Sequence, residues 1–259
     1  MTRRVRTSLV VLSSGVLAAA VLGCAQAPPE PPPPGPLQQV AYLKASNPGM
    51  FDHFGEGGAL DGHIGMGVAI SGDGNTMAVG SQHEASNARG INGNQNDESA
   101  YNAGAVYVFT GGGANWTQQA YVKPSTAEGG DHFGSTVALS DDGNTMAVAA
   151  PWESSGATGV NGDEADNSIP QAGAAYVFTR SGTTWTQQAY IKASNTGVPA
   201  VDGVQGDGDQ YGFSLALSGD GNTLAVGAVT EDSSATGING DQADDSAMSA
   251  GAVYVYTRT

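Results

Sequence analysis

The chain has 259 residues, enough for one large or two small globular units, and 39% of them are hydrophobic. Charged residues make up only 13%, and the 39 glycines disfavour helices because each costs roughly 1 kcal/mol in a helix. With 25 acidic and 9 basic residues the formal charge is −16, so the basic surface needed to bind nucleic acid is missing.

The N-terminus has the pattern of a secretory signal with a lipid-attachment site. Three arginines precede an apolar run over residues 9–21, which is too short for a membrane span of about 20 residues. The run ends in VLGC at 21–24, which resembles the bacterial lipobox, whose cysteine becomes the lipidated first residue. An ordinary signal with a chance cysteine is the alternative. Because Cys24 is the only cysteine, we expect a signal peptide over 1–23 and a lipid on Cys24.

Residues 24–37 are expected to form a lipidated stalk. The stretch APPEPPPPGP at 27–36 favours extended polyproline II of about 3.1 Å per residue, although it also fits a ligand for a proline-binding domain. Removal of 1–23 leaves a charge balance of 6 − 25 = −19. The lipobox resemblance implies a lipid-anchored protein of the bacterial cell envelope. Ala25 after the cysteine implies the outer membrane of a Gram-negative host, periplasmic or surface-exposed.

Three copies of one sequence unit fill residues 38–259. Asp142 follows Asp73 by 69 residues and precedes Asp220 by 78, and the flanking elements keep the same spacing. The recurring elements are SGDGNTMAVG (71–80, 140–149, 218–227), AGAVYVFT (103–110, 172–179, 250–257) and WTQQAYIKAS (116–125, 185–194 and, more loosely, 37–46). The repeats therefore run over about 47–123, 124–193 and 194–259.

Each repeat is predicted to contain four antiparallel strands. In the second repeat, apolar runs at 137–139 and 146–148 flank an Asp-Gly-Asn turn, and 175–178 and 184–191 flank a second turn at 181–183. Tandem four-stranded units indicate an all-β, β-propeller-type fold of three blades. The chain stops after the third strand of the last unit, so 38–46 is the candidate closing strand.

Three blades are fewer than the four to eight of typical propellers. An open arc would expose apolar residues on the two outer blades: Val68, Ile70, Val253 and Val255. Two chains pairing head to tail would make a six-bladed ring, with 38–46 closing its own third blade or that of its partner. A truncated relic of a longer gene is the alternative.

The repeat resembles the FG-GAP repeat of the integrin α-subunit propeller and of bacterial secreted proteins. Phe133-Gly134 stands at the FG position and Ala149-Ala150-Pro151 at the GAP position. The other units have Tyr211-Gly212 with Gly227-Ala228-Val229, and Ile64-Gly65 with Gly80-Ser81-Gln82; Asp52-His53-Phe54-Gly55 is a near copy ten residues earlier. The resemblance implies a propeller whose loops at one rim contact a protein or glycan partner. Three repeats depart from the seven of the integrin ring.

Members of this family often bind calcium in a D-x-D-x-D-G loop between the first two strands. Here that place holds only Asp-Gly in a tight turn, and calcium needs six to eight oxygens, so the site does not carry over. Acidic loops between the second and third strands are the alternative calcium site. The candidate ligands are Asn161, Asp163, Glu164, Asp166, Asn239, Asp241, Asp244 and Asp245. Such residues also make solvated turns without any metal.

Other residue patterns favour packing over chemistry. The histidines at 53, 63, 83 and 132 lack zinc-type spacing, and Trp116 and Trp185 recur at one strand position. Trp152, beside a long loop, is the candidate ligand-binding aromatic. No GxSxG or other nucleophile signature supports a hydrolase.

We therefore expect a non-catalytic, lipid-anchored binding or adhesion module. The alternatives are a propeller hydrolase acting on glycans or phosphoesters, and a structural component of the envelope. Calcium is the one cofactor considered, and a homodimer that completes the ring is the expected self-association.

Overall fold

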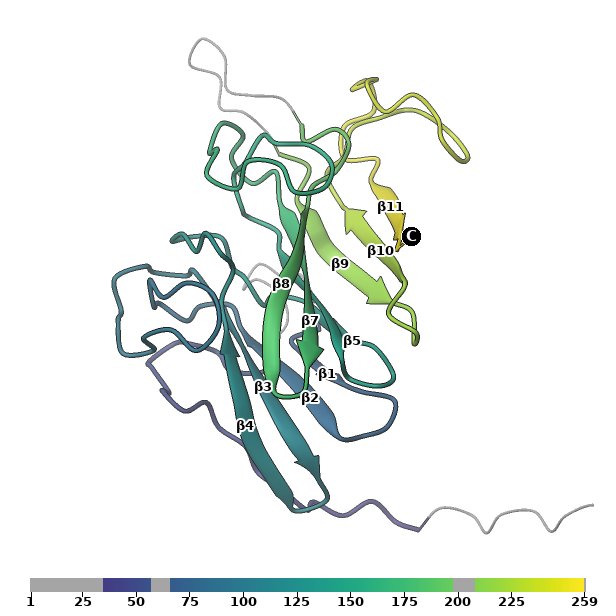
Figure 1. The fold of residues 1–259 in the computed structure, drawn as a ribbon. Coiled ribbons are helices and arrows are strands. Elements are labelled where there is room, and N and C mark those ends of the chain that lie inside the picture. Colours follow the sequence, from purple (N-terminus) through teal and green to yellow (C-terminus); the bar gives the residue numbers. More distant parts are fainter. Residues whose placement is uncertain (1–34, 57–65, 198–207, 259) are drawn as a thin grey trace, which may run out of the picture. The chain divides into compact units, whose positions relative to one another are not determined.

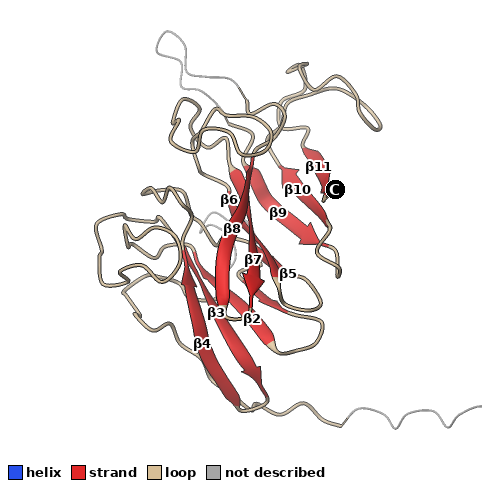
Figure 2. Cartoon of the chain, viewed as in Figure 1, coloured by secondary structure: helices blue, strands red, loops and turns tan. Residues whose placement is uncertain are grey.

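The computed structural model describes residues 35–56, 66–197 and 208–258. The chain divides into a unit of residues 1–38 and a unit of residues 39–259, and the propeller-type fold belongs to the second. The predicted signal peptide and Cys24 lie outside the described residues. Strands, turns and loops make up the described part of the chain, where no helix is long and apolar enough to cross a membrane (Figure 2).

The strands form three antiparallel sheets, which we call blades one, two and three (Figure 1). Blade one contains β1 (Val68–Ile70), β2 (Thr76–Ser81), β3 (Ala105–Gly112) and β4 (Asn115–Val122) in that order. Blade two contains β5 (Val137–Leu139), β6 (Thr145–Ala150), β7 (Ala174–Ser181) and β8 (Thr184–Ile191). Blade three contains β9 (Tyr211–Leu217), β10 (Thr223–Ala228) and β11 (Ala252–Thr257). The all-β, blade-type prediction is confirmed.

Short polar side chains close the first hairpin of each blade. In blade two Asp142 Oδ1 accepts hydrogen bonds from the Ser140 hydroxyl (2.6 Å) and the Asn144 amide (3.0 Å), and Gly143 adopts φ +65°. The Ser140 hydroxyl, followed by the Asn144 groups, lowers the pKa of Asp142. Because these bonds recur at Asp73 and Asp220, the carboxylates of this element close turns.

Neighbouring blades pack face to face through a repeated apolar contact. Val106 and Val108 of β3 share one core with Val137 of β5, and Leu139 packs against it. The same four positions meet again between blades two and three, as Ala175, Val177, Leu215 and Leu217. In each blade, we call the face that carries Val106 and Val108, or their equivalents, the front face. The face that carries Val137 and Leu139, or their equivalents, is the back face.

The aromatic ring of the FG element anchors each blade. Phe133 lies edge-on to Tyr176 at 5.4 Å between centroids, and the corresponding Tyr211 has the same relation to Tyr254 at 5.6 Å. In blade one this place belongs to Phe54, 5.5 Å from Tyr107. Assignment of the element to Ile64-Gly65 is therefore corrected to Phe54-Gly55, and the insertion follows the element; residues 64 and 65 themselves lie outside the described range.

The outer blades each leave one face open. Val68 and Ile70 on the back of blade one are 49% and 56% exposed, and Val253 and Val255 on the front of blade three are 68% and 64% exposed. The exposure expected for an open arc is thereby confirmed. Burial of these residues needs another blade on each side.

The segment predicted as a closing strand pairs with no strand among the described residues. Residues 39–46 have no regular secondary structure, and Leu43 and Ala45 pack on the back of blade one, beside Tyr107. The expectation that 38–46 closes the chain's own third blade is thus not met, because the segment occupies the far side of blade one. Ile191 and its neighbours take the same place on the back of blade three.

Candidate functional site

Three long loops join the second and third strands of the blades. They cover residues 82–104, 151–173 and 229–251, and we call them together the loop face (Figure 1). Each begins at the end of β2, β6 or β10, whereas the tight hairpins lie at the opposite ends of the strands. The candidate calcium and ligand-binding residues all belong to these loops.

A buried ion pair fixes the start of the loop to the end of the fourth strand. Lys192 Nζ lies 2.6 Å from Glu153 Oε2, and Glu153 Oε1 accepts hydrogen bonds from the Tyr190 hydroxyl (3.0 Å) and the Ser155 amide (3.0 Å). In blade one the pair recurs as Lys123 with Glu84 at 3.0 Å. Burial lowers the pKa of Lys192 and raises that of Glu153, and their proximity opposes both shifts.

Asn161, one of the candidate calcium ligands, instead holds the loop against β8. Its side-chain Oδ1 accepts a hydrogen bond from the Tyr190 backbone amide (3.0 Å), and its own backbone amide donates to the Tyr190 carbonyl (2.7 Å). Asn161 adopts φ +57°, a conformation that asparagine tolerates better than most residues. Asn239 has the same φ in blade three, where its side of β11 carries no fourth strand.

The acidic candidates of blade two are bonded within the protein. Asp163 Oδ1 accepts from the amide of Ala165 (2.9 Å), and Asp166 accepts from Gly156, Ser168 and the Ser168 hydroxyl at 2.9–3.0 Å. Glu164 accepts from Gln187 Nε2 at 2.9 Å and from the Ser125 and Thr126 hydroxyls of the segment that leads to β5. These bonds shape the loops and link neighbouring blades.

The acids of blade three have related roles. Asp241 accepts from the Ala243 amide (3.0 Å), Asp244 accepts from the Ser246 amide (3.0 Å) and the Ser234 hydroxyl, and Asp245 is exposed. No three of the candidate acids converge on one point within the described residues. Calcium binding at these loops stays a prediction, and it would require an ion to displace several of these bonds.

A hollow opens on the loop face between blades one and two. Its lining includes Tyr101, whose side chain is 73% exposed, together with Asn87, Arg89, Ser99 and Glu128. Across the hollow's rim Asn167 donates to Glu128 at 2.8 Å. An exposed aromatic ring beside amide, hydroxyl and charged groups suits a polar ligand.

Trp152 lies at one end of a row of aromatic rings in edge-on and tilted contacts. Its ring centroid is 4.0 Å from that of His132, which is 5.0 Å from His83, which is 4.7 Å from His53. His53, His83 and His132 thus contact other aromatic rings, whereas His63 lies outside the described residues. Trp152 is half-buried, and its role as a free ligand-binding aromatic stays a prediction.

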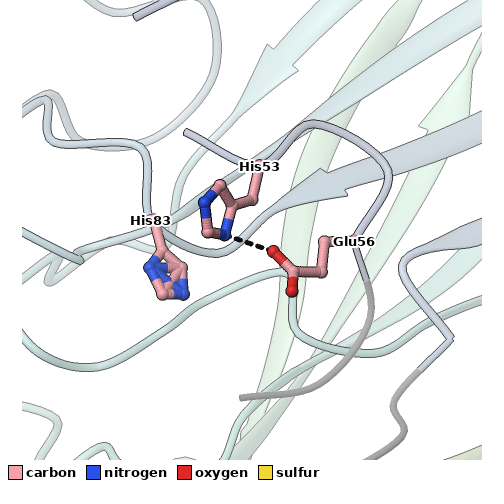
Figure 3. Close-up of side chains that lie close together, drawn as sticks. All are labelled: His53, Glu56 and His83. Atoms are coloured by element: carbon pink, nitrogen blue, oxygen red, sulfur yellow. Dashed lines mark ion pairs between the residues drawn. The ribbon is translucent and has the colours of Figure 1, made fainter. Parts of the chain in front are cut away.

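One end of this row gathers metal-binding donors that their sequence spacing does not reveal. His53, Glu56 and His83 place one donor atom each within 4.8 Å of one another, and His53 Nδ1 contacts the Glu56 carboxylate (Figure 3). Burial, followed by the charge of His53, lowers the pKa of His83, which keeps the imidazole neutral. Two imidazoles and a carboxylate are the ligands of many zinc sites that keep one position open.

Comparison with known proteins agrees with the blade architecture. Residues 116–178, which run from β4 into β7, match the family model described as the FG-GAP repeat. No curated protein matches the chain. Residues 116–178 are therefore similar to an FG-GAP repeat. This similarity agrees with the contact between the Phe133 and Tyr176 rings and with the propeller-type blades.

Proposed function

We propose that this protein is a non-catalytic binding module of the bacterial cell envelope, with the loop face as its ligand-contacting surface. The observation that carries the proposal is the threefold use of one rigid loop design on one end of the blades. The bonds of Asn92 with β4 and of Asn161 with β8 fix the loops of blades one and two, which lowers the conformational entropy lost when a ligand binds.

The ligand class that best suits the hollow is a glycan. The Tyr101 ring offers a flat apolar surface, while Arg89, Asn87 and Glu128 offer donors and acceptors for hydroxyl groups. A protein partner of the envelope is the second class, because loops on rigid scaffolds also serve protein recognition.

A glycan array and a pull-down from envelope extracts, both with the full chain, test this proposal. We expect Tyr101→Ala and Arg89→Ala to abolish the retained signal, and Thr183→Ala, in the opposite hairpin, to leave it unchanged. Equal binding by all variants would exclude the hollow. Turnover of a glycoside, ester or phosphoester that survives repurification would exclude a non-catalytic role.

Envelope attachment is tested separately. Cys24→Ala should abolish incorporation of labelled fatty acid and release the protein from the membrane fraction, because the lipid is proposed to be its anchor. Unchanged labelling and membrane retention would contradict lipidation at this residue.

A further inference from the structure

Among the described residues, blade three has three strands and a groove where the other two blades have a fourth strand. A groove runs along β11 beneath the loop over 229–251, lined by Glu231, Ile238, Asn239, Val253 and Val255. The corresponding space in blade two holds β8, with Tyr190 and Lys192 buried. The groove therefore has the outline of a missing fourth strand.

The loop over this groove has the residues that, in blade two, contact the fourth strand. Glu231 is 3% exposed, like Glu153, yet the described residues give it no lysine or arginine partner. Asn239 holds the same φ as Asn161, and Ile238 is 91% exposed where Val160 forms a bridge to β8. A buried carboxylate without a counter-charge is costly, which indicates an absent cationic strand.

One segment of the sequence has the pattern of a fourth strand, including the lysine, but pairs with none of the described strands. Ala41-Tyr42-Leu43-Lys44 corresponds to Ala189-Tyr190-Ile191-Lys192, and Lys44 and Tyr42 are exposed, the latter by 80%. Residues 43–45 pack on the back of blade one in the same way that residues 191–193, at the end of blade two, pack on the back of blade three. Asn47 accepts from the Tyr107 hydroxyl (2.6 Å) and donates to Glu84 (3.3 Å), and Asn195 makes the same two bonds in blade three.

We propose that residues 37–46 of a second copy of this chain form the fourth strand of blade three, with Lys44 paired to Glu231 across the interface. The two copies join head to tail. By the repeated blade contact, Val253 and Val255 of one copy then pack on Val68 and Ile70 of the other, so both open apolar faces are covered. The segment needs no rearrangement, because it already sits where a preceding blade would end.

The number of copies follows from ring closure. Propellers of four to eight blades are the usual closed forms, and six is the only multiple of three in that range. A head-to-tail contact that closes after two copies makes a discrete ring, whereas one that does not close makes filaments. The assembly is therefore a dimer with six blades.

Disulfide trapping tests the strand pairing. In blade two Val177 lies opposite Ala189, which places Ala41 of one copy opposite Val255 of the other. We mix two full chains in mild detergent, Ala41→Cys and Val255→Cys, each carrying Cys24→Ala, and expect an oxidised heterodimer. Thr183→Cys mixed with Met248→Cys, two exposed positions outside the groove, is the control. No covalent dimer, or cross-linking within a single doubly substituted chain, would overturn the exchange.

Light scattering and a charge exchange test the ion pair. We expect twice the chain mass for the wild type and at least about a hundredfold weaker dimerisation for Lys44→Glu, because one charge of a buried pair is reversed. Adding Glu231→Lys should restore the dimer, and Arg89→Glu, with the same charge change, should retain it. Since Lys44 is exposed, its replacement leaves the fold of each copy intact. A monomer at every concentration, or open assemblies larger than a dimer, would overturn the proposal.

A second, independent inference concerns the histidine cluster. His83 Nε2 is buried and has no hydrogen-bond partner among the described residues, although it faces His53 and Glu56 (Figure 3). An orphaned buried donor is costly unless a ligand satisfies it. We infer that His53, Glu56 and His83 bind a divalent transition metal, for which Zn²⁺ is the best match to two imidazoles and a carboxylate.

Equilibrium dialysis of the full chain against Zn²⁺, followed by elemental analysis, tests this site. We expect about one bound ion per chain for three convergent ligands, loss of most of it in His83→Gln and Glu56→Gln, and retention in His132→Gln. Unchanged uptake in the two ligand variants, or no uptake by the wild type, would overturn the site.

Discussion

Two nearly identical segments of this chain have opposite fates. Ala-Tyr-Ile-Lys-Ala at 189–193 is buried in blade two, with Tyr190 only 1% exposed and Lys192 fully buried. Ala-Tyr-Leu-Lys-Ala at 41–45 has Tyr42 80% exposed and Lys44 exposed. The difference arises because β7 pairs with the first segment, whereas none of the described strands of the same chain pairs with the second. Local sequence therefore encodes the capacity to be a fourth strand, and the neighbouring strand decides whether it becomes one.

The same contrast separates blade two from blade three. The first five residues of β7 are buried. In β11, whose sequence is almost the same, half-buried and exposed residues alternate. Burial on the front face needs both a fourth strand and a following blade. Substitutions in blade two should therefore have larger effects than those at the equivalent positions of blade three and the N-terminal segment.

The largest difference is expected at the two lysines. Lys192→Met leaves Glu153 buried without its counter-charge and should lower the free energy of unfolding by about 3–5 kcal/mol. Lys44→Met removes an exposed charge and should cost less than about 1 kcal/mol when the copies are separate. Urea denaturation of dilute protein measures both, and equal losses would refute the comparison.

The next effect is a pH dependence of blade two. Burial, and then the charge of Glu153, raises the pKa of Asp131 to about 7. Between pH 4 and 7 the unfolded chain releases a proton that folded Asp131 retains, so this group's contribution to stability falls as the pH rises, by roughly 4 kcal/mol at most. Asp131→Asn should remove the decline, as measured by urea denaturation from pH 4 to 7.

His132 acts in the opposite sense. Burial lowers its pKa to about 4, so the unfolded chain binds the proton first, and this group's contribution to stability rises as the pH increases from about 4 to about 6.5. Blade three has Gln210 at this position, with the same left-handed backbone. His132→Gln should therefore steepen the decline caused by Asp131, and an unchanged pH profile in both variants would contradict the two assignments.

A smaller difference is expected at the front-face valines. Val177 is 7% exposed and Val255 is 64% exposed. Val177→Ala should cost about 1.5–3 kcal/mol of unfolding free energy through lost burial, and Val255→Ala less than about 0.5 kcal/mol in dilute protein. If the dimer forms, Val255→Ala should also lower its melting temperature at high protein concentration, where the front face is covered.

The smallest difference is expected at the loop asparagines. Asn161→Ala loses two-way bonding with the backbone of β8 and a residue type suited to φ > 0, for a loss of about 1–2 kcal/mol. Asn239→Ala loses only the backbone preference, roughly 1 kcal/mol or less. Calorimetric melting of the dilute variants distinguishes the two, and a larger loss for Asn239→Ala would contradict the role given to β8.

The sequence alone determined the repeat, most of the strands and the class of fold. Repeats spaced by 69 and 78 residues fixed which segments are equivalent, and alternating apolar and turn residues placed the strands of blade two correctly. Even the exposed quartet of Val68, Ile70, Val253 and Val255 followed from the number of repeats. These features are local or periodic, so they can be read without knowing distant contacts.

Tertiary structure alone decided which polar residues meet. The Lys192–Glu153 pair joins residues 39 apart, and its in-phase recurrence at Lys123 and Glu84 is the sequence signal that could have revealed it. His53 and His83 converge only because the FG element of blade one and the end of β2 lie side by side. Likewise, residues 39–46 have a strand sequence but no strand, because strands are stabilised by hydrogen bonds to a partner, and the partner's position is a property of the fold.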